Sequence, residues 1–215
     1  MKKIIILFGA PGSGKGTLGE CIKNELIAQH KACLQNIHYV STGDLLRAEI
    51  ASSSELGKQI SAIVQSGGLV SDEIVGQLIE TELKKVKDGD FIFIDGYPRT
   101  KAQLDTLSSI VDASFHVTTI RRKTSEKVIK SRISKRRVCA DCKTTHTVDE
   151  GCCPKCGGAS TIRKDDAVID KRLEEYRTNT LPIWNYMAFI SKQMYTVDGS
   201  IEASEAAQDL VKRHF

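Results

Sequence analysis

The stretch Gly9-Ala-Pro-Gly-Ser-Gly-Lys-Gly-Thr17 decides the fold of this chain, because it matches the pattern G-x-x-x-x-G-K-[ST]. It follows the unbroken apolar run Ile4–Phe8 and precedes apolar residues at helical spacing from about Lys15 to Gln29. Glycines let successive N–H groups of such a loop face one anion, and the start of the following helix adds its positive dipole. The sequence therefore predicts a phosphate-binding loop made of Gly9, Ala10, Pro11, Gly12, Ser13, Gly14, Lys15, Gly16 and Thr17.

Strand and helix patterns alternate along the rest of the chain. Phe91–Ile94 is a second unbroken apolar run, as expected for a strand buried on both faces of a parallel sheet. Weaker strand patterns cover 115–120 and 194–197. Helical patterns cover 44–65, 72–85 with Ser71 as N-cap, 169–192 and 204–213. This alternation predicts an α/β fold of the P-loop NTPase type, a doubly wound parallel sheet with helices on both faces.

The composition of the 215-residue chain is that of a globular domain, with 40% hydrophobic and 27% charged residues. No apolar stretch approaches the roughly 20 residues that span a bilayer, so no membrane insertion is expected. The run Ile4–Phe8 is also too short for a signal peptide, which favours a cytoplasmic location. Basic residues concentrate at 121–123 and 135–137, and a solvated helix face is the default interpretation of such runs.

Four of the seven cysteines form two Cys-x-x-Cys pairs with ten residues between them. Thiols stay reduced in a chain expected in the cytoplasm, so clustered cysteines favour a metal over disulfides. Four thiolates favour zinc, in a structural role because four protein ligands leave no open position. Cys152 competes with Cys153 for the third place, and His146 is an alternative ligand. The predicted ligands are Cys139, Cys142, Cys153 and Cys156.

Two arginines indicate a second anion site. Arg47 and Arg99 lie just after loops that follow predicted strands, in the crevice where α/β sheets bind ligands. Their guanidinium groups suit a phosphate dianion. Asp95 ends its strand beside the phosphate loop, so its carboxylate can hold Mg²⁺ through water, and Thr17 can also face the ion. Capping of a turn is the alternative interpretation of Asp95.

Three motifs make the chain resemble the adenylate kinases over nearly its whole length. They are Gly14-Lys-Gly-Thr17, Ser41-Thr-Gly-Asp-Leu-Leu-Arg47, and Asp95-Gly-Tyr-Pro-Arg99 followed by Gln103. The resemblance implies reversible transfer of a phosphoryl group from ATP with Mg²⁺ to AMP, giving two ADP, by a monomer that binds no nucleic acid and no membrane. The protein then supplies no general base, because the phosphate of AMP is already an anionic nucleophile at neutral pH.

The resemblance also implies roles for individual residues. Arg132 packs on the ATP adenine, and Asp165 and Asp166 orient neighbouring arginines. The transferring group is stabilised by Lys15, Arg136, Arg163 and Arg172. AMP is surrounded by Thr42, Arg47, Leu69, Val70, Gly96, Arg99 and Gln103. The Gln103 amide is apt for an adenine edge because it can both donate and accept.

The expected organisation is a core interrupted by two functional segments. Residues 1–137 and 167–215 form the core. Within the core, residues 41–71 form the segment that binds the monophosphate. Residues 138–166 form an inserted zinc lid whose folding depends on the metal. The interval between the cysteine pairs is shorter than in most metal-bearing members, which predicts a reduced lid. Five residues separate Asp166 from Arg172, about two fewer than usual, so Lys171 competes with Arg172 for its role. Arg121-Arg122-Lys123 receives no role.

Two other functions fit parts of the sequence. A UMP/CMP kinase would share the phosphate loop and the acceptor arginines, whereas Gln103 and the cysteine pairs favour AMP. A nucleotide-dependent protein with a zinc ribbon could instead bind RNA through the basic runs. An aromatic content of 6% supplies few platforms for base stacking, which argues against RNA.

Overall fold

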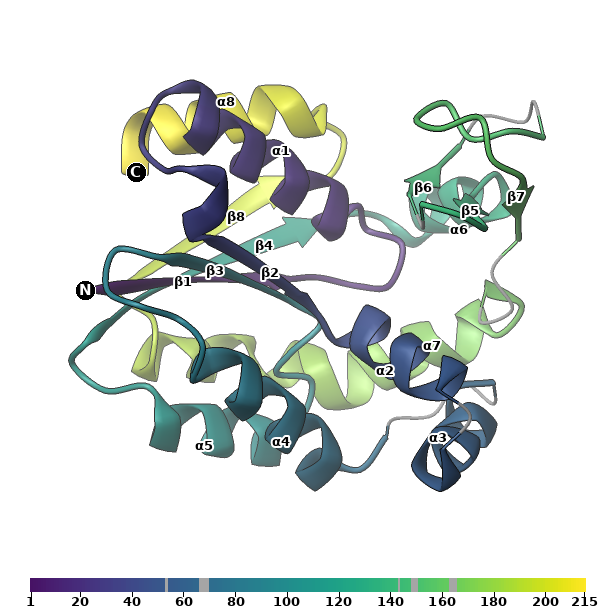
Figure 1. The fold of residues 1–215 in the computed structure, drawn as a ribbon, viewed down its shortest axis with the longest axis horizontal. Coiled ribbons are helices and arrows are strands. Elements are labelled where there is room, and N and C mark those ends of the chain that lie inside the picture. The colour runs from purple at the N-terminus through teal and green to yellow at the C-terminus, as the bar shows by residue number, and fades with distance from the viewer. Residues whose placement is uncertain (53, 66–69, 143, 148–150, 163–165) are drawn as a thin grey trace.

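The centre of the molecule is a five-stranded parallel sheet with strand order β2-β3-β1-β4-β8 (Figure 1). The structure is a computed structural model that describes residues 1–52, 54–65, 70–142, 144–147, 151–162 and 166–215. The strands are β1 (Lys2–Phe8), β2 (Ile37–Ser41), β3 (Phe91–Asp95), β4 (Phe115–Lys123) and β8 (Gln193–Asp198). All five carboxyl ends therefore meet at one edge, where α/β sheets bind their ligands.

Helices cover both faces of this sheet (Figure 1). The helices α1 (Lys15–Ala28) and α8 (Ala203–His214) lie on one face. The other face carries α4 (Asp72–Leu83), α5 (Lys101–Ile110) and the 3-10 stretch η4 (Leu181–Phe189). Alternate side chains of β1 enter different cores, Ile4 and Ile6 on one side and Ile5 and Leu7 on the other. The predicted doubly wound α/β fold is confirmed.

The predicted helix over 44–65 is wrong in detail, because two helices occupy the segment. They are α2 (Thr42–Ala51) and α3 (Glu55–Gln65). The hydroxyl of Ser52 donates to the Glu49 carbonyl (2.7 Å), and the hydroxyl of Ser54 accepts from the Gly57 amide (2.8 Å). Serine side chains that bond the local backbone in this way end one helix and start the next.

The predicted helix over 169–192 is also divided. It consists of α7 (Ile169–Glu175), the π-helical turn η3 (Tyr176–Thr180) and η4. Pro182 lacks an N–H group and cannot continue the hydrogen-bond pattern of an α-helix. The prediction of a helix from Asp72 with Ser71 as its cap is confirmed, because the Ser71 hydroxyl accepts from the Ile74 amide.

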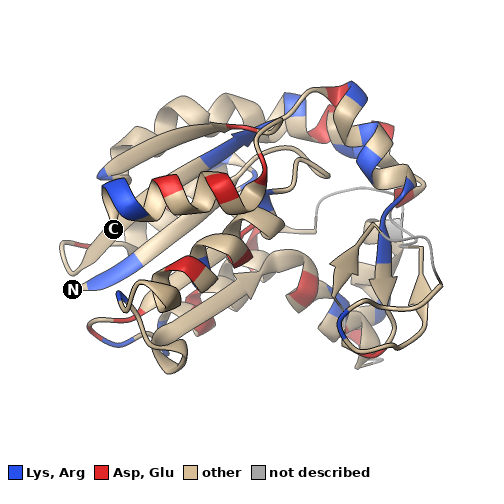
Figure 2. Cartoon of the chain, turned by 90° about the horizontal axis from the view of Figure 1, so that it is seen from above, with Lys and Arg blue, Asp and Glu red and all other residues tan. Residues whose placement is uncertain are grey.

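A small antiparallel sheet stands apart at one end of the molecule (Figures 1 and 2). Its strand order is β6-β5-β7, with β5 (Arg137–Cys139), β6 (Thr145–His146) and β7 (Ser160–Thr161). It follows α6 (Glu126–Ser134) and precedes α7, within the segment expected to be an insertion. A 3-10 turn, η1 (Leu34–Asn36), leads into β2.

The expectation that Arg121-Arg122-Lys123 forms a solvated helix face is wrong. The run ends strand β4, and Arg122 is only 3% exposed. The Nη2 of Arg122 donates a hydrogen bond to the Ile201 carbonyl (2.6 Å), 79 residues further along the chain. Figure 2 shows basic residues interspersed with acidic ones along the outer helices. In the part of the chain that the structure describes, no helix is long and apolar enough to cross a membrane.

Candidate functional site

The predicted phosphate loop joins β1 to α1 and has the backbone that its glycines allow. Gly12 and Gly14 have φ angles of 77° and 87°, in the left-handed region that disfavours other residues. A side chain on Gly12 would also place its Cβ 2.6 Å from Cδ1 of Ile133. Gly14 is the N-cap of α1, so the loop directs the first free amides of the helix toward one point. The loop is therefore built as an anion site.

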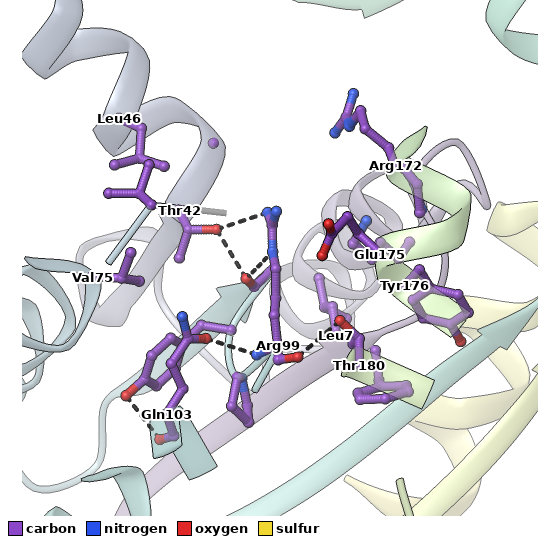
Figure 3. Close-up of a pocket in the computed structure, with 18 of the residues that line it drawn as sticks. Leu7, Thr42, Leu46, Val75, Arg99, Gln103, Arg172, Glu175, Tyr176 and Thr180 are labelled. Atoms are coloured by element: carbon purple, nitrogen blue, oxygen red, sulfur yellow. Dashed lines mark hydrogen bonds between the residues drawn. The ribbon is translucent and has the colours of Figure 1, made fainter. Parts of the chain in front are cut away.

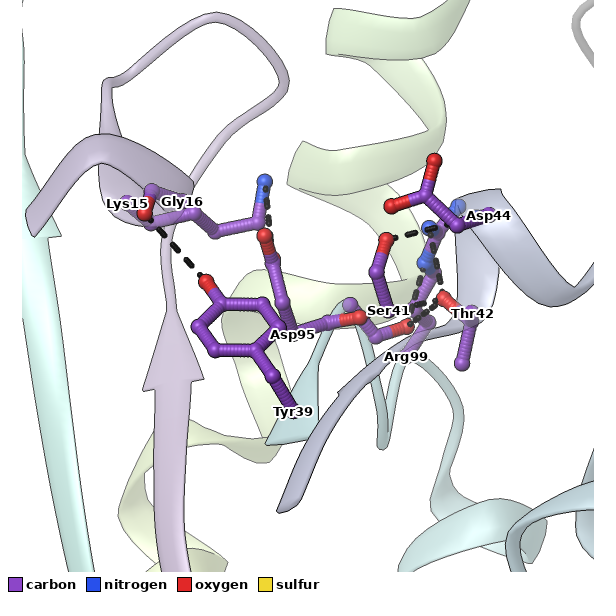
Figure 4. Close-up of polar contacts among 9 residues, drawn as sticks. Lys15, Gly16, Tyr39, Ser41, Thr42, Asp44, Asp95 and Arg99 are labelled. Atoms are coloured by element: carbon purple, nitrogen blue, oxygen red, sulfur yellow. Dashed lines mark hydrogen bonds and ion pairs between the residues drawn. The ribbon is translucent and has the colours of Figure 1, made fainter. Parts of the chain in front are cut away.

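Lys15 and Asp95 point toward one another at the end of the phosphate loop (Figure 4). The Lys15 Nζ lies 3.7 Å from Asp95 Oδ1, because β1 and β3 are parallel with Leu7 opposite Asp95. Burial lowers the pKa of Lys15, and the Asp95 charge partly opposes that effect. The Tyr39 hydroxyl donates to the Gly16 carbonyl (3.2 Å) and fixes the loop from β2. Burial, followed by the Asp95 charge, raises the pKa of Tyr39.

One pocket adjoins this loop and is lined by residues from five separate segments of the chain (Figure 3). Its lining includes Gly9, Pro11 and Lys15 from the loop and Arg172 from α7. All the residues predicted to bind AMP that the structure describes also line it: Thr42, Arg47, Val70, Gly96, Arg99 and Gln103. Leu69 lies outside the described residues. The structure thus brings two predicted anion sites into one cavity.

Arg99 occupies the centre of the pocket and is held by backbone and side-chain groups (Figure 3). Its Nε donates to the Gly96 carbonyl (2.7 Å) and its Nη2 to the Thr42 hydroxyl (3.2 Å). The Thr180 hydroxyl donates to the Arg99 carbonyl (3.0 Å). Arg47 is more exposed: its side chain is 42% exposed and pairs with Asp44 within α2. Arg99 is therefore held by several partners inside the pocket, whereas Arg47 reaches it from a partly exposed position.

Gln103 is buried, and both ends of its amide already have partners. Its Oε1 accepts from the Arg99 amide (2.7 Å), and its Nε2 donates to Asp72 Oδ1 (2.8 Å). The predicted contact with an adenine edge would therefore share or replace these bonds. Asp72 is a partner that the sequence analysis missed, and no local signal identifies it because 31 residues separate it from Gln103.

Arg136 and Arg172 converge on a buried carboxylate. Arg136 binds both oxygens of Asp166, with Nε 2.9 Å from Oδ2, and Arg172 Nη1 lies 3.9 Å from Oδ1. The Asp166 side chain is only 4% exposed. Arg172 keeps a place in the pocket despite the shortened interval, whereas Lys171 is exposed. Arg163 and Asp165 lie outside the described residues.

Arg132 bridges the phosphate loop and the segment after β8. Its Nη1 donates to the Ser13 carbonyl (3.2 Å) and its Nη2 to the Gly199 carbonyl (2.9 Å). The guanidinium group therefore lies beside the loop, on the side of β4 and β8. This is the side away from Arg99, which follows β3.

The four predicted metal ligands come together in the small sheet. The sulfur atoms of Cys139, Cys142, Cys153 and Cys156 all lie within 4.8 Å of one another. The Sγ–Sγ distances are 3.4 Å for Cys139–Cys156 and 3.6 Å for Cys142–Cys153. Tetrahedral zinc with Zn–S bonds of about 2.3 Å separates its sulfurs by about 3.8 Å, so the cluster fits that ion.

The two alternative ligands are placed elsewhere. Cys152 is exposed and forms an isolated β-bridge with Ala159. His146 Nε2 lies 2.7 Å from the Ser160 hydroxyl. Among the described residues, neither belongs to the four-sulfur cluster.

The fold and the site define a class of protein: a P-loop phosphotransferase whose phosphate loop shares a pocket with a second arginine-lined anion site. Comparisons with known proteins agree. The family model described as "Adenylate kinase" matches residues 7–192. The chain belongs to the adenylate kinase family, and it is a nucleoside monophosphate kinase.

Curated relatives match nearly the whole chain. The adenylate kinase of Borrelia garinii is 33% identical over 97% of this chain and 96% of its own. That of Treponema denticola is 38% identical over 84% of this chain and 85% of its own. That of Thermosipho melanesiensis is 33% identical over 96% and 97%, respectively. The match therefore includes the small sheet as well as the core.

Proposed function

We propose that this enzyme transfers the terminal phosphoryl group of ATP to AMP and forms two ADP. The observation that carries the proposal is the single pocket shared by Lys15 and Arg99. Lys15 belongs to the loop that would hold the donor phosphates, and Arg99 to the wall that would hold the acceptor phosphate. Two nucleotides bound there would meet phosphate to phosphate, as in-line transfer requires.

The proposed mechanism is positioning and charge neutralisation. Arg47 and Arg99 would align the AMP phosphate, which attacks as an anion without a general base. Positive charge around the transferring group would come from Lys15, Arg136, Arg163 and Arg172. Asp166 keeps Arg136 and Arg172 together, so their charges are preorganised for that role.

Water must be excluded during transfer, or it would compete with AMP for the phosphoryl group. We assign this task to two segments. Residues 41–71 would cover the acceptor, and residues 138–166 would form a lid over the donor. Residues 1–137 and 167–215 would form the core that carries both. Arg136, which precedes the lid segment by two residues, binds Asp166, the last residue of that segment. Closure of both segments is expected to be part of turnover.

Two metals complete the proposal. Asp95, which lies 3.7 Å from Lys15, and Thr17, two residues after Lys15 in the chain, would hold Mg²⁺, the carboxylate through water. When bound with ATP, Mg²⁺ would supply positive charge that offsets the charge of the phosphates. Zinc bound by Cys139, Cys142, Cys153 and Cys156 would stabilise the lid, whose short strands bury little apolar surface. We expect a cytoplasmic monomer with no nucleic-acid or membrane partner.

The test is product analysis with purified enzyme, ATP and Mg²⁺ against a panel of AMP, UMP, CMP and GMP. Two ADP formed per ATP and AMP consumed, with AMP preferred over the other three acceptors, is the expected result. Preference for UMP or CMP would identify the alternative enzyme. ATP hydrolysis that ignores every monophosphate, together with salt-sensitive RNA binding, would replace the proposal with the RNA-binding alternative.

A further inference from the structure

The side-chain amide of Gln103 is held in one orientation by two partners of opposite kind. Its Oε1 accepts from the Arg99 backbone amide (2.7 Å), as Figure 3 shows. Its Nε2 donates to Asp72 Oδ1 (2.8 Å). A backbone amide can only donate, and an ionised carboxylate can only accept. Turning the Gln103 amide over would therefore place two donors together at Arg99 and two acceptors together at Asp72.

Asp72 is itself fixed, because it is the first residue of α4 and joins that helix to the start of α5. Its Oδ2 accepts from the Thr100 hydroxyl (2.8 Å). Thr100 is the N-cap of α5, and the same hydroxyl accepts from the backbone amide of Gln103 (3.1 Å). The Tyr97 hydroxyl donates to the Gln103 carbonyl (3.0 Å). Both oxygens of the carboxylate are thus in use, and the backbone of Gln103 is held as firmly as its side chain.

Gln103 lines the acceptor pocket, together with Thr42, Val70 and Val75. The oxygen of a side-chain amide has two lone pairs and its nitrogen has two hydrogens. Arg99 and Asp72 use one of each. One acceptor and one donor of Gln103 therefore remain for a ligand in the pocket, and their relative positions are determined by the two partners.

The substituent at position 6 of a purine determines which orientation of an amide it can pair with. Adenine has an amino donor at position 6 and an acceptor at N1, so it pairs with an amide oxygen and an amide N–H in that order. Hypoxanthine has a carbonyl at position 6 and a hydrogen on N1, which is the reverse pattern. The wrong base would place like groups against one another inside the pocket, and polar groups left unpaired in this way are costly.

We propose that Asp72 is a positioning residue that sets the base selectivity of the acceptor site. By holding the nitrogen of the Gln103 amide on its own side, Asp72 makes the pocket accept purine monophosphates with an amino group at position 6 and reject those with a carbonyl there. The inference rests on the proposed function, and it concerns a residue that acts through Gln103. An amide free to turn over would serve either base.

The experiment compares kcat/KM for AMP and IMP in the wild type and in Asp72→Asn, with ATP saturating. Asparagine has nearly the same shape as aspartate but can either donate or accept, so it tolerates both orientations of Gln103. We expect kcat/KM for IMP to rise and the ratio of AMP to IMP to fall by at least about tenfold, the size of one hydrogen bond to a charged group. KM for ATP should change little. Structural damage alone would lower the use of both acceptors and would not raise that of IMP.

Glu73→Gln is the matched control. Glu73 is the next residue of the same helical turn and is exposed, so the change removes the same charge from the start of α4. The ratio of AMP to IMP should stay at the wild-type value in this variant, whatever happens to its stability. An unchanged ratio in a folded Asp72→Asn enzyme would overturn the inference.

Asp72→Ser keeps the inference testable if Asp72→Asn does not fold. Serine is well tolerated at the start of a helix, and its hydroxyl also donates and accepts, so the same fall in the ratio is expected. Failure of the proposed function gives a different result, because wild-type enzyme would then form no ADP from AMP. Use of AMP by the wild type, with a ratio that neither Asp72 variant alters, would overturn the role of Asp72 alone.

Discussion

Lys15 Nζ lies 3.7 Å from Asp95 Oδ1, between the phosphate loop and the end of β3 (Figure 4). Burial lowers the pKa of Lys15, and the negative charge of Asp95 raises it again in part. Since only the protonated amine can neutralise a phosphate, Asp95 preserves the active form of the lysine in alkaline solution. The carboxylate therefore has a role that is independent of magnesium.

Replacing Asp95 by Asn should shift the pH dependence of phosphoryl transfer. Loss of the opposite charge lowers the pKa of Lys15 further, so the alkaline limb of the kcat/KM profile moves to lower pH. The measurement is a pH profile at saturating Mg²⁺, which separates this effect from weaker metal binding. Asp105→Asn, an exposed carboxylate paired with Lys101, should keep the wild-type profile. An alkaline limb that stays in place in Asp95→Asn would contradict the coupling.

Arg99→Ala should weaken acceptor binding selectively. The guanidinium is held by Gly96 and Thr42 within the pocket, and a hydrogen bond to a charged group contributes about 1.5–3 kcal/mol. We therefore expect KM for AMP to rise at least about tenfold while KM for ATP changes little. Steady-state kinetics with each nucleotide varied in turn is the measurement.

Arg177→Ala provides the comparison for that variant. Arg177 is a half-exposed arginine that pairs with Glu126 and Glu174, so its loss should leave both KM values near those of the wild type. Equal increases in the two KM values of Arg99→Ala would show that Arg99 does not belong to the acceptor site.

Changing Cys139 and Cys142 to Ser should remove the metal and destabilise the small sheet. The four sulfurs fit one tetrahedral ion, and strands of two or three residues cannot fold that segment without it. We expect zinc content measured by atomic spectroscopy to fall from one per chain to near zero, with a lower Tm.

Cys152→Ser tests whether the neighbouring thiol competes for the ion. Cys152 is exposed and lies outside the four-sulfur cluster, so metal content and Tm should stay unchanged. Loss of zinc in Cys152→Ser, or its retention after the change of Cys139 and Cys142, would reject the assigned ligand set.

Local sequence patterns predicted the parts of the fold that carry strong local signals. The loop at 9–17 and the buried strand β3 were recognised because glycine spacing and unbroken apolar runs are visible within a few residues. The strand that precedes Arg47 was expected, but the bounds of β2 were not recognised, since its sequence Ile-His-Tyr-Val-Ser has no such run and only Val40 is buried. As an edge strand, β2 needs less apolar surface than β3 does.

The candidate site shows the same division between local and long-range signals. Thr42, Arg47 and Arg99 could be named from motifs, and the structure brings them around one pocket. The environment of Arg122 could not be predicted, because its partner Ile201 lies 79 residues away. A buried cation depends on such distant acceptors, and a single sequence gives no direct sign of them.

Asp166→Asn should destabilise the enzyme more than loss of an exposed carboxylate. Asp166 is almost fully buried and serves both Arg136 and Arg172. Removing one partner of a buried ion pair leaves uncompensated charge and costs about 3 kcal/mol. Urea unfolding gives the difference, and Asp170→Asn, an exposed carboxylate paired with Lys130, should match the wild type. Equal stabilities of the two variants would contradict the importance of the buried pair.

Asp90, which directly precedes β3, should make the free energy of unfolding depend on pH. Its carboxylate accepts from the Lys87 amide (2.8 Å), from Asn36 Nδ2 (3.0 Å) and from His38 (3.1 Å). These bonds, that from Lys87 foremost, hold the pKa of Asp90 below its usual value. A depressed pKa means that the ionised form stabilises the fold above pH about 4, the unfolded value, and that this stability is lost as the pH falls through the folded pKa.

Asp90→Asn should therefore lower the free energy of unfolding by about 1–3 kcal/mol at neutral pH. The deficit should shrink as the solution is acidified, because wild-type Asp90 then becomes neutral as well. Urea unfolding of both proteins at a series of pH values from neutral to acid measures this convergence. Asp88→Asn changes a neighbouring exposed carboxylate and should show no such trend. A deficit that is constant with pH would mean that the Asp90 hydrogen bonds do not depend on its charge.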